Sequence, residues 1–181
     1  FGVFPDETKQ YLQKFSKKYN DVKIIEMLDS LKPLKVLVIG DTIIDEYHFT
    51  TPLGQSAKGT HLAVQYDYRE RFLGGSLAIT NHVAGFVEGP TIVSGLGKEK
   101  ESEGFIRSNL AENISPEFYY FVDAPTVVKR RFVDSDLNKL FEVYLYDENS
   151  KLENYGEDIC SWLDKNIEDF DVVIVSDFGN G

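Results

Sequence analysis

Two short apolar runs, each followed at once by an aspartate, constrain the fold of this chain more than any other feature. They are "KVLVIG" before Asp41 and "DVVIVS" before Asp177. Nearly continuous apolar runs of this length are typical of strands buried on both faces of a parallel sheet. Ligands of open α/β sheets bind beyond the carboxyl ends of the strands, so both aspartates are candidates to accept hydrogen bonds from the hydroxyls of a polyol.

Helical and strand-like patterns alternate along the rest of the chain. Apolar residues spaced by three or four predict helices at residues 6–19, 22–31, 76–86, 101–112 and 154–167. Strands are predicted at residues 61–68 (half buried), 90–96, 118–122, 126–133 and 140–146, with an irregular polar passage at residues 50–60. We therefore predict an α/β fold, with a parallel sheet covered on both faces and a second, antiparallel layer formed by residues 61–68 and 126–146.

Composition excludes several classes of function. The 181 residues carry a net charge of −11, which argues against a nucleic-acid partner because such binding depends on Lys and Arg. A single cysteine, Cys160, allows neither an intramolecular disulfide nor a multi-cysteine zinc site. The three histidines are scattered, so no metal site is expected. The acidic stretch 147–171 is interpreted as a solvated surface.

The same sequence gives no sign of membrane insertion or export. No apolar run approaches the roughly 20 residues that span a bilayer, and the first residues lack the pattern of a secretory signal. We expect a soluble, cytoplasmic protein with no membrane partner. The only methionine is Met27, and the last residues form an apolar strand followed by a turn, so we also expect the chain to be an excerpt of a longer one.

Further polar groups could reach a ligand at the first strand. Gly74 and Gly75 precede an expected helix, where adjacent glycines let backbone amides approach an oxygen-rich ligand, although a simple turn is the alternative. Asp45 lies four residues after Asp41 and could merely be exposed. Asp41 itself could instead cap a following helical turn.

A basic cluster, Lys129 to Arg131, stands out in this acidic chain. Strand alternation sends Lys129 and Arg131 to one face and Arg130 to the other. The cluster could bind a phosphate on a sugar, or it could protect an edge strand. Known nucleotide-binding loops are absent: "SGLGKEKESEG" has Lys100 where G-x-G-x-x-G needs its third glycine, and no Walker loop occurs.

Taken in order, "VLVIGDTIIDEY", "FLGGSLAITNHVAGF", "PTVVKRRFV" and "VVIVSDFGNG" resemble the ribokinase-like (PfkB-type) carbohydrate kinases. Within that family, the heptose-phosphate kinase branch, whose members join kinase and nucleotidyltransferase units, is the most similar. The resemblance covers about residues 34–181. It implies an α/β core with a β lid at about 49–72 and 126–146, through which such kinases often form homodimers. Residues 1–33 are then expected to be a helical linker from a preceding unit, such as a nucleotidyltransferase.

The resemblance also implies roles for individual residues. Asp41 matches the family's acceptor of sugar hydroxyls, and Gly74 with Gly75 matches the glycine pair that lets the sugar lie close to the backbone. Asp45 would steady the loop or the lid. A sugar or sugar phosphate would thus bind at the end of the first core strand. Asp177, which follows the strand "DVVIVS", would also be part of this substrate site.

Other implied parts concern phosphate and ATP. Lys129 and Arg131 would lie near a phosphate already on the sugar. The expected cofactors are ATP and Mg²⁺. The catalytic Asp, carried by a Gly-Ala-Gly-Asp segment, and most of the ATP site are expected after Gly181, so no catalytic residue is expected within this chain.

Departures from the family pattern leave alternatives open. Ala78 and Ile79 stand where the family usually carries an Asn that contacts the sugar, and Asn81 is the nearest candidate. Asn180 stands where the closing motif usually has Lys. One reading is an ATP-dependent kinase for a sugar or a heptose-phosphate-like substrate. The other is a non-catalytic sugar-binding or dimerisation module in a protein whose main activity is nucleotidyl transfer.

Overall fold

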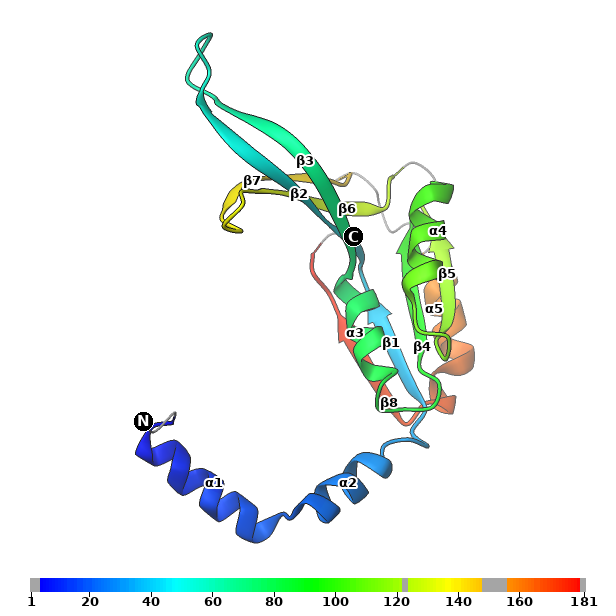
Figure 1. The fold of residues 1–181 in the computed structure, drawn as a ribbon. Coiled ribbons are helices and arrows are strands. Elements are labelled where there is room, and N and C mark those ends of the chain that lie inside the picture. The colour runs from blue at the N-terminus through cyan, green and yellow to red at the C-terminus, as the bar shows by residue number, and fades with distance from the viewer. Residues whose placement is uncertain (1–3, 122–123, 148–155, 180–181) are drawn as a thin grey trace.

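Two four-stranded sheets form the framework of the protein (Figure 1). The computed structural model describes residues 4–121, 124–147 and 156–179. The first sheet, called the core sheet here, has the strand order β5-β4-β1-β8 and is parallel throughout. The second, called the lid sheet, has the order β3-β2-β6-β7 and projects from the carboxyl ends of the core strands.

The elements follow one another closely along the chain. The strands are β1 (Val36–Gly40), β2 (Thr42–Gln55), β3 (Leu62–Gly74), β4 (Thr91–Leu96), β5 (Ser115–Tyr120), β6 (Val127–Val133), β7 (Lys139–Leu145) and β8 (Val172–Ser176). The helices are α1 (Asp6–Lys18), α2 (Asp21–Asp29), α3 (Gly75–Val83), α4 (Lys100–Asn109), α5 (Gly156–Asn166) and the short 3-10 helix η2 (Ile167–Asp169). Most lie close to their predicted ranges, whereas η2 was not expected. Three residues of predicted features lie outside the described residues. They are the last residue of the predicted strand 118–122 (Val122), the first residue of the predicted helix 154–167 (Asn154) and Asn180 of the closing motif.

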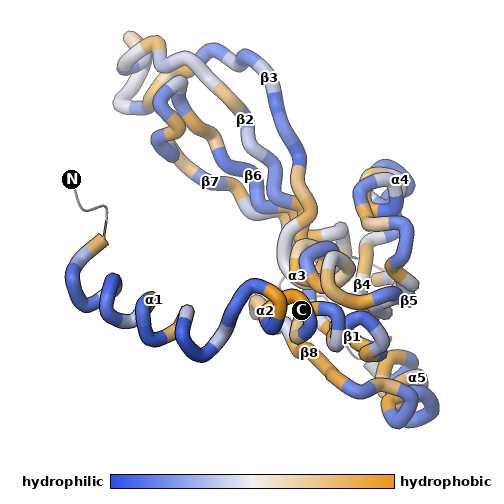
Figure 2. Tube along the Cα trace, turned by 60° about the horizontal axis from the view of Figure 1, so that its bottom comes forward, coloured by the Kyte–Doolittle hydropathy of each residue, from blue (hydrophilic) through white to orange (hydrophobic). Residues whose placement is uncertain are grey.

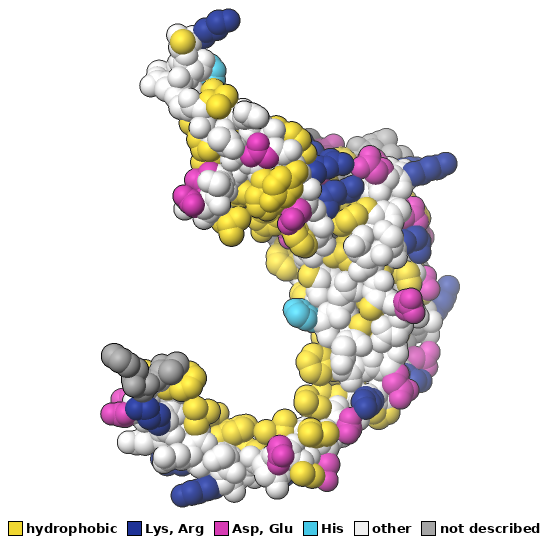
Figure 3. All heavy atoms as spheres, in the orientation of Figure 1, with side chains coloured by type: hydrophobic (Ala, Val, Ile, Leu, Met, Phe, Trp, Pro, Cys, Tyr) yellow, Lys and Arg dark blue, Asp and Glu magenta, His cyan; other side chains and the backbone are white. Residues whose placement is uncertain are grey.

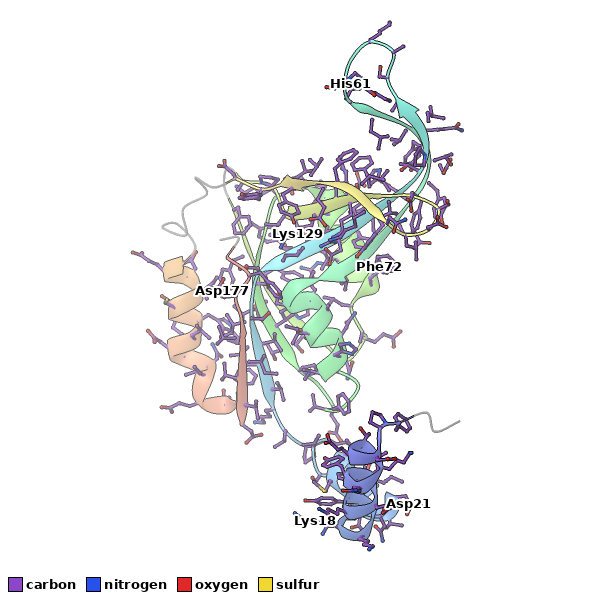
Figure 4. All side chains as sticks on the ribbon, turned by 90° about the vertical axis from the view of Figure 1, so that its left-hand side faces the viewer. Lys18, Asp21, His61, Phe72, Lys129 and Asp177 are labelled. Carbon is purple, nitrogen blue, oxygen red and sulfur yellow. The ribbon has the colours of Figure 1, made fainter. Side chains whose placement is uncertain are left out.

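The core sheet is apolar on both of its faces, as its sequence pattern predicts. Leu37 and Val38 are both fully buried although successive residues of a strand point to opposite faces. Helices α3 and α4 cover one face, where Leu77, Ile92 and Ile106 belong to one buried cluster. Helix α5 lies on the other side of the sheet (Figure 4). The predicted parallel sheet with helices on both faces is confirmed.

The lid sheet is mixed, whereas an antiparallel second layer was predicted. β2 pairs antiparallel with β3, and β6 with β7, but β2 and β6 are parallel. β2 follows core strand β1 and β6 follows core strand β5, and these two core strands run in the same direction. Both lid strands therefore leave the core in the same direction, and they pair in parallel where they meet.

The lid also begins earlier than the predicted residue 49. β2 starts at Thr42, directly after Asp41, and continues through most of the passage expected to be irregular, with register shifts beside Phe49 and Pro52. The start of this strand was hidden because Asp45 and Glu46 put a charged group on each of its faces, so no apolar alternation marks it.

The strand predicted at residues 61–68 is present within β3, but it is mostly exposed rather than half buried. Figure 2 shows β3 as mainly hydrophilic along its length. It forms an outer strand of the lid sheet and pairs only with β2 among the described residues. The chain reaches from β3 back into the core at Gly74, where α3 begins.

Two helices precede the core sheet and extend away from its lower end (Figure 1). Helix α1 has Asp6 and Glu7 in its first turn. Helix α2 is capped by Asn20, whose side chain accepts a hydrogen bond of 2.8 Å from the backbone N–H of Lys23. Neither helix has a buried residue. No helix in the described part of the chain is long and apolar enough to cross a membrane.

Candidate functional site

Asp41 lies at the carboxyl end of β1, where the core sheet meets the lid. Its backbone N–H donates to the carbonyl of Ser176 (3.2 Å), and its Oδ2 accepts from the backbone N–H of Phe178 (2.9 Å). Asp177, between these two partners, accepts a 2.7 Å hydrogen bond from the N–H of Gly179. The ends of β1 and β8 are thus tied together, and both predicted aspartates lie at this edge. Because strand β2 follows Asp41, the alternative that Asp41 caps a following helical turn is wrong.

The glycine pair brings the start of α3 against this edge. Gly75 has φ +56°, and a Cβ there would lie 2.5 Å from the carbonyl oxygen of Asp41. The backbone N–H of Ser76 donates to that same oxygen at 3.0 Å. Gly74 lies so close to the Asp45 carboxylate that any side chain would displace it. The pair therefore does more than form a turn. Because neither glycine has a side chain, the Asp41 backbone and the Asp45 carboxylate can both lie against the start of α3.

Buried hydroxyls that we did not predict hold the backbone beside Asp41. The Ser94 hydroxyl donates to the carbonyl of Gly40 at 2.5 Å and lies 2.6 Å from the hydroxyl of Thr42. The Ser76 hydroxyl donates to the carbonyl of Asp41 at 2.9 Å. The only sequence signal was a serine inside the otherwise apolar strand β4, a position where a polar group needs a partner.

The inner face of the lid, defined by Asp45, Tyr47, Lys129, Arg131 and Tyr144, carries the basic cluster. Lys129 is directly opposite Asp45 in the β2–β6 pairing, and Arg131 forms an ion pair with the Asp45 carboxylate. Arg131 also lies 5.3 Å from the ring centre of Tyr47. The predicted alternation is confirmed, since Arg130 bonds to groups of the opposite face. β6 lies between β2 and β7, so the alternative of edge-strand protection is wrong.

Lys129 differs from Arg131 in its surroundings. Its ammonium group lies 5.6 Å from the ring centre of Tyr144 and 5.9 Å from that of Phe178, within the range of cation–π attraction. Among the residues that the structure describes, Lys129 has no acidic partner within ion-pair distance. Figure 4 places Lys129 on the lid side of the junction and Asp177 at the core side. Within the described part of the chain, the contacts of the Lys129 ammonium group are thus aromatic rings rather than carboxylates.

The charges around Arg131 are matched to one another. Burial would lower the pKa of Arg131, but the hydrogen bond and charge of Asp45 outweigh it and raise that pKa. Hydrogen bonds from Tyr144 and Lys139 lower the pKa of Glu142 to about 2. Glu142 also lies 3.4 Å from Nε of Arg131. Arg131 is thus held between two carboxylates, which fixes its position and partly neutralises it.

The opposite face of the lid contains a buried carboxylate that was not among the predicted site residues. Glu46 is only 3% exposed. Its Oε1 accepts from Nε of Arg130 at 2.6 Å and lies 2.5 Å from Nε2 of His48, while its Oε2 lies 3.5 Å from Arg69. Burial would raise the pKa of Glu46, but the hydrogen bonds with His48 and Arg130 outweigh it and lower that pKa.

This buried group connects the lid to helix α4. Arg71, 3.9 Å from Glu46, donates to Glu101 of α4 at 3.1 Å. The Arg71 guanidinium also lies 4.3 Å from the ring centre of Phe105, another α4 residue. The lid and the core are therefore joined by charge and by stacking, in addition to the β2 backbone.

Asn81 does not lie with the other predicted site residues. Its amide donates to the carbonyl of Asn109 and accepts from the N–H of Ala111, both at 3.0 Å, so it binds the end of α4. Asn81 and Ala78 line a cleft of about 360 Å³ together with Arg71, Phe72, Leu73, His82 and Asn109. Sugar contact through Asn81 stays a prediction that these hydrogen bonds do not favour.

Within the described residues, no cluster of three or more His, Cys, Asp or Glu side chains could hold a metal ion. Nor do the described loops include the phosphate-binding sequences sought above. No residue described here is therefore assigned to ATP or Mg²⁺.

Comparisons with known proteins agree with this architecture. No protein-family model matches the chain. It is 25% identical over 158 residues to the bifunctional protein HldE of Shewanella piezotolerans, and 26% identical over 152 residues to that of Pasteurella multocida. These alignments cover 86% and 83% of this chain but 32% and 31% of the relatives. The chain thus spans about a third of the length of the curated relatives it matches.

Solved structures also share the fold. A carbohydrate kinase from Agrobacterium tumefaciens superposes with a TM-score of 0.57 at 18% identity, covering 78% of this chain and 45% of that one. A microbiome-derived acarbose kinase superposes with a TM-score of 0.52 at 18% identity, covering 80% of this chain and 46% of that one. Both matches extend over less than half of the solved chains.

Proposed function

Because this chain has the ribokinase-like carbohydrate kinase fold, we propose that it supplies the sugar-binding half and the lid of a kinase that phosphorylates a sugar or sugar phosphate. One observation carries the proposal: Asp41, the glycine pair and the basic inner face of the lid converge at the carboxyl ends of β1 and β8. A ligand at that edge would contact an anionic group from the core and a cationic group from the lid.

Each side of this site suits a different part of the substrate. The Asp41 carboxylate is an acceptor only, so it would select hydroxyl donors and orient the sugar against the start of α3. Lys129 would attract a phosphate on the same molecule, since its charge is not already matched by an acid among the described residues. Arg131, held by Asp45 and Glu142, would act mainly by positioning the lid.

The motif resemblance favours a heptose-phosphate-like substrate. ATP, with Mg²⁺, would supply the phosphoryl group when bound. In the family that the motifs resemble, the catalytic base is the Asp of a Gly-Ala-Gly-Asp segment, which is not found in this sequence. Homodimer formation through the lid, a cytoplasmic location and a linker role for residues 1–33 remain parts of the proposal.

A non-catalytic sugar-binding or dimerisation module is the second candidate. Its support is Asn81, which is engaged with α4 at the place where a sugar contact was sought. It would leave nucleotidyl transfer as the main activity of the whole protein. The two candidates differ in one observable, which is sugar-dependent ATP turnover.

The test compares three variants of the full-length protein that contains this chain. With Asp41→Asn we expect kcat/KM for the sugar substrate to fall about 100-fold, because two charge-assisted hydrogen bonds are weakened. Lys129→Met should raise KM for a sugar phosphate and leave KM for the unphosphorylated sugar unchanged. Asp164→Asn, an exposed acid on α5, is the matched control.

Two results would contradict the proposal. Full activity of the Asp41→Asn enzyme would remove Asp41 from the sugar site. Sugar binding without ATP turnover by a folded wild-type protein, measured by calorimetry, would favour the non-catalytic module.

A further inference from the structure

Helices α1 and α2 present apolar side chains that nothing in the described structure covers. Tyr11 is 63% exposed, Met27 53% and Phe15 37%. Helices of 13 and 9 residues are marginal on their own in water, and most helix stability in proteins comes from packing of an apolar face. The two helices therefore need a partner surface.

The apolar side chains of the two helices enclose a groove, called the arm groove here. Its volume is about 810 Å³. It is lined by Tyr11, Lys14, Phe15, Lys18, Tyr19, Ile24, Met27, Leu28 and Leu31. Figure 3 shows hydrophobic side chains gathered on the concave side of this arm, and Figure 4 shows Lys18 and Asp21 near the junction of the helices. The surface suits another amphipathic helix.

Charge along α1 indicates which helix fits. Spacings of three and four put Glu7, Tyr11, Lys14, Phe15 and Lys18 on one side of the helix. The acid is in the first turn and the lysines are toward the last turn. An identical helix laid antiparallel brings Glu7 of each copy beside Lys18 of the other, while the tyrosine and phenylalanine rings meet at the centre.

We propose that the arm groove is an interface between two copies of this chain, in which the α1–α2 units pack face to face about a two-fold axis with their α1 helices antiparallel. The surface is self-complementary, as such an axis requires. A parallel arrangement would place lysine against lysine. An anionic membrane is disfavoured because Glu7 lies on the apolar side and the chain carries a net charge of −11.

This interface is separate from the lid and does not depend on kinase activity. Charge exchange tests it directly by sedimentation velocity on the 181-residue chain across a concentration series. We expect the dissociation constant of this contact to rise roughly tenfold in Glu7→Lys and in Lys18→Glu, because two symmetric attractions become repulsions. The double variant Glu7→Lys/Lys18→Glu should return to the wild-type value.

Lys17→Glu is the matched control, since Lys17 is also in the last turn of α1 but does not line the arm groove. It changes the helix dipole interaction equally and should leave association unchanged. Circular dichroism of each variant verifies that α1 still forms. Association that is absent in the wild type, insensitive to both single exchanges, or not restored in the double variant overturns the proposal.

Discussion

Gly75 combines two constraints at a single residue. Its φ of +56° lies in the left-handed region, and the space beside it is taken by the Asp41 carbonyl and the Ile43 side chain. A side chain here must therefore distort the start of α3 or push Asp41 away. The left-handed conformation of Gly75 and the position of Asp41, the proposed sugar acceptor, therefore depend on each other.

We expect Gly75→Ala to lower the free energy of unfolding by about 2–4 kcal/mol, because it adds backbone strain and a close contact. Urea denaturation measures this change. Gly104→Ala in α4 is the control, since nothing lies within 4 Å of the added methyl, and it should raise stability by up to about 1 kcal/mol. Equal changes in the free energy of unfolding in Gly75→Ala and Gly104→Ala would show that the close contact with Asp41 does not determine the cost of a side chain at residue 75.

The positions of some residues of the candidate site could be predicted from sequence because they follow from local patterns. Asp41 and Asp177 follow apolar strands, and Lys129 and Arg131 share a face by simple alternation. Glu46 could not be found in this way, since its partners come from three strands whose pairing is not written in any local pattern. Its burial depends on the parallel contact of β2 with β6.

At the scale of elements, the lid is held by a carboxylate with several cationic neighbours. We expect Glu46→Gln to lower the free energy of unfolding by about 3–5 kcal/mol, because Arg130 and its neighbours lose their buried counter-charge. Glu101→Gln, whose side chain is 76% exposed, should change stability by less than about 1 kcal/mol. Hydrogen exchange of β2 and β6 amides should rise in the first variant only.

The pH dependence of the same variant has a definite sign. The pKa of Glu46 is lowered in the folded state from its ordinary 4.5. Its stabilisation is therefore fully present above pH ~4.5 and is lost as pH falls through the folded value. The difference in melting temperature between wild type and Glu46→Gln should shrink on acidification, and a constant difference would contradict this assignment.

For the whole molecule, the fold class followed from the order of apolar periods, because buried parallel strands and helices have different repeats. The direction of β6 relative to β2 did not follow, since the crossover from β5 sets it. The exposed arm of α1 and α2 was predicted to be helical, but that its apolar side chains lie uncovered became apparent only from the arrangement of the described residues.

The edge strand β8 gives a prediction at this scale. Val173 and Val175 are 39% and 71% exposed on one side of the strand, and among the described strands β8 pairs only with β1. We expect Val175→Lys to reduce light scattering by the concentrated chain, because exposed apolar edge strands promote association. Leu137→Lys, a 68% exposed leucine in the lid hairpin, is the comparison. A clean wild-type monomer would contradict this expectation.

Strand β2 leaves Asp41 and reaches the far end of the lid within 14 residues. At roughly 3.3 Å per residue it is a rod of about 45 Å. The backbone at the start of this strand is held in place by two hydrogen bonds. The Ser76 hydroxyl donates to the carbonyl of Asp41, and the Ser94 hydroxyl donates to the carbonyl of Gly40. A displacement of the lid tip that is carried along β2 would therefore reach the backbone that holds Asp41.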